Sequence, residues 1–353
     1  MKAQNTRVVP VGGDALAEAA RLIRAGEPVA VPTETVYGLA ADATSEAAVA
    51  RIYAVKGRPS FNPLIVHVGS LAEAERLGMF SEAARALAGA FWPGALTLVV
   101  PVRKGSGLAA AVTAGLPSVA LRCPAHPAMQ ALLAAAGRPL AAPSANASGA
   151  ISPTRAEHVL AGLDGRIAMI LDAGPTERGL ESTIVAVEEG EVRLLRPGPI
   201  SFDDIAAALS PPWKGGVGGG FPEGGRNSES EKVPLRSPSH LQPFPSREGR
   251  IEAPGQMRSH YAPSKPLRLD AVAASPEEWL IGFGAVEGDD NLSPSGSLVE
   301  AAARLFDALH RADAQLHSRI AVAPIPNHGI GLAINDRLSR AAAPRSGGSG
   351  RPE

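Results

Sequence analysis

Apolar residues recur with helical spacing in several segments of the first 205 residues, and short apolar runs separate those segments. Stripes behind an N-terminal cap predict helices that begin near Asp14, Ser45, Ser70 and Ser81. Two further helices are expected over 127–136 and 153–161, each with proline in its first turn. The apolar runs predict strands over 28–31, 64–68, 96–100, 118–122, 167–171, 182–187 and 192–195. This alternation favours an α/β fold.

The chain changes character after residue 205, where the periodic pattern stops. Residues 211–250 are rich in Gly, Ser, Pro, Arg and Glu without an apolar period, so we expect a flexible, low-complexity insertion there. Its glycine run is not a phosphate loop, because no Gly-Lys-Ser or Gly-Lys-Thr follows. A second α/β pattern comes next, with expected strands over 280–283 and 319–323 and helices over 297–312 and 330–342. We therefore expect domains over 1–205 and 267–343, a linker over 206–266 and a disordered tail over 344–353.

Composition narrows the classes of protein to consider. Of the 353 residues, 45% are hydrophobic and 20% are charged, as in a globular protein with a core. The net charge of −1 argues against a protein that coats nucleic acid. The single cysteine, Cys123, lies in an apolar run and is expected in the core, and it excludes an intrachain disulfide and a thiolate zinc site. We recognise no signal peptide or membrane helix, so we expect a cytoplasmic protein.

Two polar clusters follow early elements of the predicted fold. Residues 32–39 come directly after an apolar strand, and their threonines and Glu34 place donors and acceptors at a strand end. Taken alone, this cluster also fits an ordinary hydrogen-bonded turn. Residues 56–64 place Lys56 and Arg58 on a loop constrained by glycine and proline. In one interpretation, Lys56 only interacts favourably with the negative end of the helix dipole. In the other, Lys56 and Arg58 together bind a phosphate, and the restricted loop favours this second interpretation.

Two more clusters lie farther along the chain. Arg122 ends an apolar strand, where a buried cation requires a carboxylate or a phosphate. Residues 142–154 carry four hydroxyls and one amide just before a predicted helix. That arrangement is typical of an anion site, although any serine-rich loop has it. His67, on the strand 64–68, is by itself typical of a core histidine.

Taken together, these clusters resemble the signature of the Sua5/YrdC family of threonylcarbamoyl-AMP synthases. The matching blocks are Thr-Glu-Thr-Val-Tyr-Gly-Leu at 33–39, Lys-x-Arg at 56–58, Ser-x-Asn at 144–146, Phe-Trp-Pro-Gly at 91–94, Leu-Glu-Ser-Thr at 180–183 and Arg-Pro-Gly at 196–198. Residues 254–263, 291–296 and 333–337 resemble the covering segment and the C-terminal domain of the longer Sua5 branch. The insertion over 211–250 departs from the family pattern and leaves the path of the linker open.

The resemblance implies a twisted, open, mixed sheet wrapped by helices, followed by a small Rossmann-like α/β domain. It implies that the amine of L-threonine captures CO2 from bicarbonate, and that the carbamate attacks the α-phosphorus of ATP to release pyrophosphate. A downstream tRNA threonylcarbamoyl transferase complex would then modify adenosine 37 of tRNA. ATP would arrive with Mg²⁺, without protein ligands to the metal and without a tightly bound cofactor. No membrane partner is expected, and weak direct contact with tRNA stays open.

The resemblance also implies roles for individual residues, and we expect all of them to converge in one hollow. Lys56 and Arg58 would be the catalytic cations. The residues expected to bind ATP are Arg58, Asn62, Ser118, Ser144, Asn146, Thr154, Arg196 and Tyr261. Those expected to bind L-threonine are Thr35, His67, Arg122 and Ser182, with Arg122 facing the substrate carboxylate.

Three other interpretations compete with this one. An RNA-binding module is disfavoured by the near-neutral charge and by an aromatic content of 4%, which leaves few stacking platforms. A carbamoyl-adenylate enzyme of the hydrogenase-maturation type would carry cysteine-rich zinc fingers, and this chain has one cysteine. A degenerate scaffold is disfavoured because all the polar clusters are present.

Overall fold

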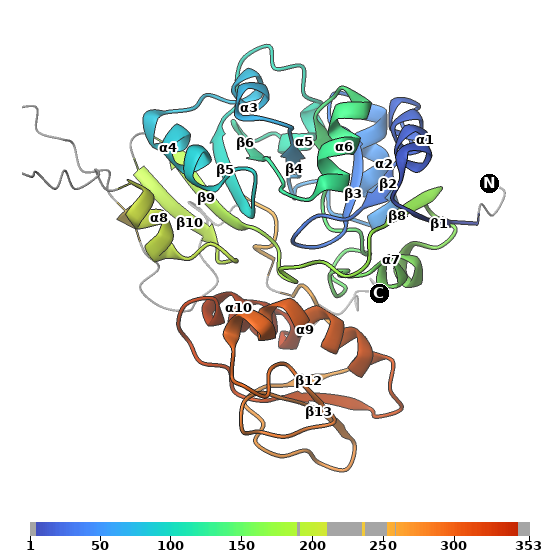
Figure 1. Ribbon diagram of the computed structural model, residues 1–353, viewed down its shortest axis with the longest axis vertical. Coiled ribbons are helices and arrows are strands. Elements are labelled where there is room, and N and C mark those ends of the chain that lie inside the picture. Colours follow the sequence, from blue (N-terminus) through green and yellow to red (C-terminus); the bar gives the residue numbers. More distant parts are fainter. Residues whose placement is uncertain (1–4, 189–190, 210–234, 237–252, 258, 345–353) are drawn as a thin grey trace, which may run out of the picture.

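The computed structural model describes residues 5–188, 191–209, 235–236, 253–257 and 259–344. These residues form a large α/β domain and a smaller one, which faces the large domain through its two helices, α9 and α10 (Figure 1). The mixed α/β class and the second small domain confirm the fold expected from the sequence. Within the described ranges, no helix is long and apolar enough to cross a membrane.

The larger sheet contains, among the described residues, 11 strands in the order β1-β8-β2-β3-β7-β4-β6-β5-β9-β10-β11. Their bounds are β1 Arg7–Pro10, β2 Val29–Val31, β3 Gly38–Asp42, β4 Ile65–His67, β5 Leu96–Pro101, β6 Ser118–Arg122, β7 Leu140–Ala141, β8 Met169–Asp172, β9 Thr183–Glu188, β10 Glu191–Arg196 and β11 Leu235–Arg236. The helices around it are α1 Gly13–Arg24, α2 Glu46–Lys56, α3 Leu71–Leu77, α4 Glu82–Phe91, α5 Ala110–Thr113, α6 Pro127–Ala136, α7 Ala156–Leu163 and α8 Phe202–Leu209.

The second domain is a parallel sheet covered by helices. Its strands are β12 Leu267–Arg268, β13 Glu278–Gly282, β14 Asp290–Asn291 and β15 Arg319–Val322, and its helices are α9 Leu298–Asp313 and α10 Gly331–Ala342. The strand order is β12-β15-β13-β14, and every adjacent pair is parallel. The parallel sheet agrees with the Rossmann-like α/β domain that the family resemblance implies, and α9 lies in the connection between β14 and β15.

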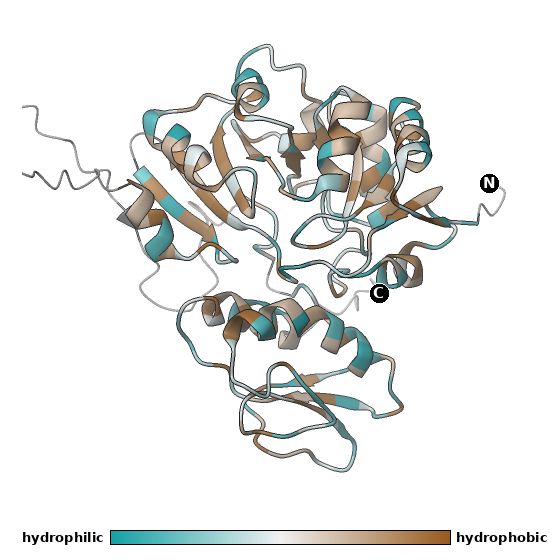
Figure 2. Cartoon of the chain, in the orientation of Figure 1, coloured by the Kyte–Doolittle hydropathy of each residue, from teal (hydrophilic) through white to brown (hydrophobic). Residues whose placement is uncertain are grey.

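The apolar cores explain how these elements hold together. Figure 2 shows apolar residues concentrated on the strands of the larger sheet. Cys123 is buried in the core of this domain, as expected. The core of the second domain also includes Val36, Leu180 and Tyr261, which belong to the first domain and to the linker. One continuous apolar cluster therefore joins the two domains beside the polar clusters identified above.

Most predicted elements are present, and a hydrogen bond to a residue distant in the chain explains where one helix starts late. Ser45 caps α2, and Gly57 ends it with a φ of 61°. The helix expected over 153–161 begins only at Ala156, because the carbonyl of Pro153 accepts a hydrogen bond from the Tyr37 amide at 2.9 Å and leaves the helical path. The N-cap of α1 is Gly12, and Asp14 lies in the first turn.

The linker needs one correction. Leu235–Arg236 form β11, which pairs parallel to β10, whereas the sequence pattern predicts irregular chain throughout 211–250. Without β11, β10 would be an edge strand with unpaired backbone N–H and C=O groups. Such groups can pair with another segment through its backbone, so the side chains of that segment do not reveal the pairing. The other residues of 211–250, and residues 345–353 of the expected tail, lie outside the described ranges.

Candidate functional site

Two strand ends bring His67 and Arg122 side by side. β4 and β6 are parallel, and His67 is the register partner of Arg122. The guanidinium of Arg122 is buried and donates to the Gly94 carbonyl at 3.1 Å, to Thr35 Oγ1 at 2.9 Å and to Glu34 Oε1 at 2.6 Å. The carboxylate that a buried cation requires is therefore Glu34.

The turn that carries Thr35 is fixed from both sides. The hydroxyl of Thr33 lies 2.8 Å from that of Thr35 and donates to the Val36 carbonyl at 2.7 Å. A bridge between Gly38 and Ser144 then joins this turn to the serine-rich loop. Clusters that lie a hundred residues apart in the chain are thus direct neighbours in space.

Lys56 is buried at the end of α2 and fastens the serine-rich loop. Its Nζ donates to the carbonyl oxygens of Ser144 and Asn146, each at 2.5 Å. Burial and the charge of Arg58 lower the pKa of Lys56 well below that of an ordinary lysine. The expected proximity of Lys56 to Ser144 and Asn146 is present, but the ammonium contacts their backbone rather than the cavity.

Arg58 points into the site from the loop after α2. Its Nε and Nη2 donate to the backbone and side-chain oxygens of Asn62 at 3.0 and 2.6 Å, and Nη2 also donates to the Pro63 carbonyl at 2.7 Å. Burial lowers the pKa of Arg58 to about 10, so the guanidinium stays charged at neutral pH. The proline-bounded loop therefore presents a fixed cation.

Arg196 and Ser182 close another wall of the site. Arg196 Nη2 donates to the Ser182 carbonyl at 2.9 Å and to its hydroxyl at 3.1 Å, and that hydroxyl lies 2.7 Å from Thr97 Oγ1. A Cβ at Gly198 would lie 2.4 Å from the Thr183 amide nitrogen and 2.8 Å from the Glu181 carbonyl. Only glycine fits this close approach, which accounts for the Arg-Pro-Gly block.

Residues 253–257 and 259–262, which we call the covering segment, lie over these walls. Gly255 has a φ of +88°, and a Cβ there would lie 2.8 Å from the Tyr261 hydroxyl oxygen. Asn62 Nδ2 contacts Met257 Sδ at 3.4 Å, and the Ala262 amide donates to the Gly149 carbonyl at 2.9 Å. The covering segment therefore contacts both the phosphate-clamp loop and the serine-rich loop.

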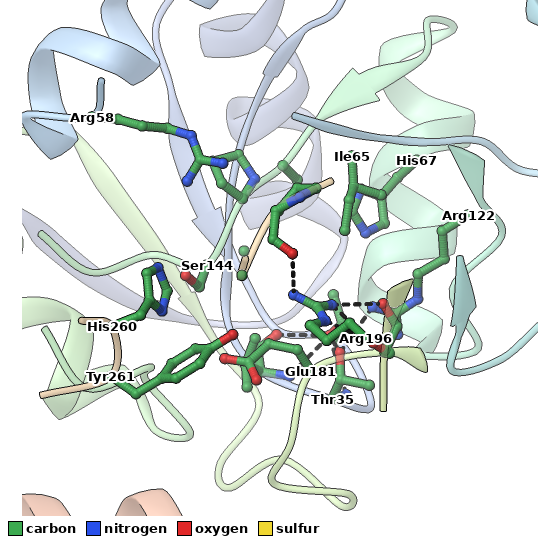
Figure 3. Close-up of a pocket in the computed structure, with 18 residues that line it drawn as sticks. Thr35, Arg58, Ile65, His67, Arg122, Ser144, Glu181, Arg196, His260 and Tyr261 are labelled. Carbon is green, nitrogen blue, oxygen red and sulfur yellow. Dashed lines mark hydrogen bonds between the residues drawn. The ribbon is translucent and has the colours of Figure 1, made fainter. Parts of the chain in front are cut away.

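These walls enclose a cavity of about 50 Å³. Figure 3 shows Arg58, Ser144, His260 and Tyr261 on one side of the hollow and His67 and Arg122 on the other. Of the residues predicted from the sequence, those that line the cavity are Thr35, Arg58, His67, Arg122, Ser144, Ser182, Arg196 and Tyr261.

Five predicted site residues do not line the cavity. Lys56, Asn62 and Asn146 lie directly behind its walls through the contacts given above. Ser118 begins β6, at the opposite end of that strand from Arg122. Thr154 is buried against His158, with its hydroxyl oxygen 3.4 Å from Nδ1.

Three residues belong to the site although the motifs gave them no role: Glu181, His260 and Arg337. Glu181 and His260 line the cavity, and Arg337 reaches Glu181 from α10 with its Nε 2.9 Å from Oε2. The sequence shows Glu181 in the 180–183 block and Arg337 in the 333–337 block. Their separation in the chain gives no indication that they are in contact.

The electrostatics of the cavity favour an anion. Burial and then the positive charges of Arg58, Lys56 and Arg196 lower the pKa of His260 well below its usual value. Burial and Arg122 lower the pKa of His67 to about 3, so its imidazole is neutral, and its Nδ1 has no hydrogen-bond partner in the described structure. Converging cations beside neutral imidazoles suit a polyphosphate next to a small zwitterion.

Comparisons with known proteins find matches over most of the chain. Residues 21–198 match the family model Sua5_yciO_yrdC, whose description is "Telomere recombination", and residues 227–343 match the model for the C-terminal domain of threonylcarbamoyl-AMP synthase. The threonylcarbamoyl-AMP synthase of Bacillus subtilis is 40% identical, over 94% of this chain and 93% of the relative. That of Pyrococcus abyssi is 37% identical, over 93% of this chain and 94% of the relative.

A solved structure agrees with these sequence matches. The crystal structure of P. abyssi Sua5 complexed with L-threonine superposes with a TM-score of 0.79 and 33% identity, covering 96% of this chain and 97% of that one. The similarity therefore extends over both domains.

Proposed function

The chain belongs to the Sua5 family of threonylcarbamoyl-AMP synthases, and from this membership we propose that it makes threonylcarbamoyl-AMP. The substrates are L-threonine, bicarbonate and ATP. The amine of threonine adds to CO2 derived from bicarbonate and loses a proton, which gives a carbamate. A carbamate oxygen then attacks the α-phosphorus, the bond from that phosphorus to the α,β-bridging oxygen breaks, and pyrophosphate leaves with that oxygen.

L-Threonine fits the wall formed by Thr35, His67, Arg122 and Ser182. This assignment is supported by the register that sets His67 beside Arg122 and by the hydrogen bond from Arg122 to Thr35. Three of the guanidinium's five N–H groups already have partners, so two remain for a substrate carboxylate. Neutral His67 adds no charge that would compete for it.

We assign ATP, which arrives with Mg²⁺, to the wall that carries Arg58 and Ser144, and its entry requires the Tyr261 region to move because the cavity is only about 50 Å³. Arg58 and Arg196 present fixed guanidinium groups, and Ser144 lines the same cavity. In-line displacement at phosphorus needs positioning and neutralisation of charge rather than a protein nucleophile. In this assignment Lys56 orients the loop that carries Ser144 and Asn146, while Arg58 and Arg196 face the phosphates.

The product is an activated acyl group, which indicates the next step. A mixed anhydride of a carbamate and AMP transfers its acyl group readily to an amine. A tRNA threonylcarbamoyl transferase complex is the partner that would pass this group to adenosine 37 of tRNA.

One observation carries this proposal: cations and hydroxyls from residues 33–261 converge on one cavity, in a chain that matches threonylcarbamoyl-AMP synthases along its length. The test incubates pure protein with ATP, Mg²⁺, labelled bicarbonate and one amino acid at a time. We expect pyrophosphate release that depends on threonine, with label captured in an AMP adduct. Release that is independent of the amino acid, or no labelled adduct, would contradict the proposal.

Variants of Lys56 and Arg58 sharpen this test. Lys56→Ala removes the ammonium that fastens the serine-rich loop, so we expect a loss of about a hundredfold or more in kcat/KM. Arg58→Ala should lose at least as much, because it removes a cation from the cavity wall. Lys104 is exposed, and Lys104→Ala should keep the wild-type rate. Full activity of either site variant at saturating ATP would remove the clamp from the mechanism.

A further inference from the structure

Arg337 is a cation of the second domain that is buried at the edge of the candidate site. It lies on α10, and its side chain is 0% exposed. Its Nε donates to Glu181 Oε2 at 2.9 Å, and its Nη1 to Asp336 Oδ2 at 2.8 Å. A buried ion pair of this kind adds little net stability compared with apolar packing, but it fixes the positions of its partners.

The first partner of Arg337 is part of the cavity wall. Glu181 lines the cavity and directly precedes Ser182, whose carbonyl and hydroxyl Arg196 holds. Its Oε1 accepts a hydrogen bond from Ser152 Oγ at 2.5 Å. Burial alone would raise the pKa of Glu181, but the charges of Arg337 and Arg196 lower it below the ordinary value. Arg337, a residue of the other domain, is therefore the largest of the influences that lower the pKa of Glu181.

The second partner is the covering segment. The guanidinium carbon of Arg337 lies 5.3 Å from the centroid of the Tyr261 ring, within the range of a cation–π contact. One turn farther along α10, Arg340 Nη1 donates to the Met257 carbonyl at 2.7 Å, and the Arg340 carbonyl accepts from the His260 amide at 3.3 Å. α10 thus contacts both described stretches of the covering segment.

The hydrogen bonding of Arg337 is not what a contact that only stabilises the fold would show. Arg337 Nη2 is buried and has no hydrogen-bond partner in the described part of the chain, which costs free energy. An apolar side chain would fill the same place without that cost. The guanidinium is placed where two of its partners, Glu181 and Tyr261, both line the cavity.

We propose that Arg337 is a positioning residue for adenylate formation, through which the second domain holds Glu181 and Tyr261 in a fixed relation at the cavity wall. The proposal rests on the proposed function, because the reaction that Arg337 would support is the one described above. Arg337 itself touches no substrate in this assignment. Its effect passes through the wall that holds Ser182 and through the ring of Tyr261.

The test compares four full-length variants with the wild type. Arg337→Met keeps the bulk of the side chain and removes its charge, Glu181→Gln keeps the shape of the acid and removes its charge, and a third variant carries both changes. Arg304→Met is the matched control, because Arg304 lies on α9 and makes only part-exposed ion pairs with Asp290 and Glu300. We measure hydrogen exchange of the covering segment without substrates, and the pH profile of threonine-dependent pyrophosphate release.

We expect Arg337→Met to speed exchange in the covering segment and to lower kcat/KM by about tenfold to a hundredfold. Without the charge of Arg337, the pKa of the buried Glu181 carboxyl rises. We therefore expect kcat/KM of this variant to decrease at acidic pH values at which the wild type stays active. The double variant has no carboxyl at this position and should lack that fall. Arg304→Met should match the wild type in every measurement.

Wild-type exchange and a wild-type pH profile in Arg337→Met would overturn the proposal, and so would an acid-side fall that persists in the double variant. If Arg337→Met does not fold, Glu181→Gln decides, and unchanged exchange of the covering segment in that variant rejects the proposal. Wild-type protein without threonine-dependent turnover would refute the proposed function alone, because the exchange measurement needs no catalysis.

Discussion

Single glycines set the fit between the covering segment and the cavity wall. Gly255 has a φ of +88°, and a Cβ there would lie 2.8 Å from the Tyr261 hydroxyl oxygen and 2.9 Å from Arg196 Cδ. Gly137, at the end of α6, has a similar φ of +65°, but nothing lies within 4 Å of its added Cβ. The two positions therefore share a backbone requirement and differ in what surrounds them.

We expect Gly255→Ala and Gly137→Ala each to lose about 1–2 kcal/mol of stability, because a left-handed conformation disfavours a side chain. Only Gly255→Ala should also lower kcat/KM, by about tenfold or more, since it displaces Tyr261 and Arg196 from the cavity wall. Chemical denaturation and steady-state pyrophosphate release measure the two effects. Equal activity of the two variants would show that the covering segment tolerates displacement.

At the level of elements, a loop of the first domain lies directly against a helix of the second. Gly179 has a φ of +68°, and a Cβ there would lie 2.4 Å from the Ala303 carbonyl and 2.6 Å from the Ala302 carbonyl, both on α9. These are backbone atoms of a regular helix, which cannot give way cheaply. Glycine at this position therefore sets how closely α9 approaches the Leu-Glu-Ser-Thr block.

Gly179→Ala should push α9 away from the first domain and separate Arg337 from Glu181. We expect a lower melting temperature and a kcat/KM reduced by about tenfold or more. Gly26→Ala is the control, because Gly26 has a φ of +80° with nothing within 4 Å of an added Cβ. A melting temperature no lower for Gly179→Ala than for Gly26→Ala would mean that the two domains adapt to each other.

The elements that sequence reasoning located are those with strong local signals. α2 has a serine cap and a terminal glycine, and β6 is a continuous apolar run, so both were predictable within the chain. β7 and β12 were not predicted, because their strand conformation comes from pairing with distant partners rather than from their own residues. The late start of α7 also comes from a distant contact, because the Tyr37 amide donates a hydrogen bond to the Pro153 carbonyl.

At the scale of the whole molecule, the convergence of the site could be predicted only through the family resemblance. Spacing alone cannot show that Gly38 bridges Ser144 or that His67 pairs with Arg122. The tie between Glu181 and Arg337 was missed because it joins two domains across an intervening linker. Local patterns carry no information about such contacts, which arise from packing of finished elements.

Buried histidines make the stability of the folded chain depend on pH. Burial lowers the pKa of His67 and of His158 to about 3, with the stacked His310 adding to the effect on His158. In the unfolded chain a histidine titrates near about 6.5. The unfolded state therefore takes up protons that the folded state refuses, and stability falls as pH drops from about 6.5 toward 3, by about 1.4 kcal/mol per pH unit for each such histidine.

Urea denaturation between about pH 7.5 and pH 5 checks this slope. His158→Gln should make stability less dependent on pH, whereas substitution of the exposed His328 by glutamine should leave the dependence unchanged. A slope that stays the same in His158→Gln would show that His158 accepts a proton in the folded protein.

The closeness of the covering segment has a consequence for the discovery of inhibitors. The cavity of about 50 Å³ is far smaller than the roughly 300–1,000 Å³ that drug-sized compounds occupy. Compounds selected by shape against this conformation would be fragments of a few atoms. A nucleotide mimic needs the Tyr261 region to have moved aside, so we expect a screen against the protein in solution to find chemotypes that this rigid shape rejects.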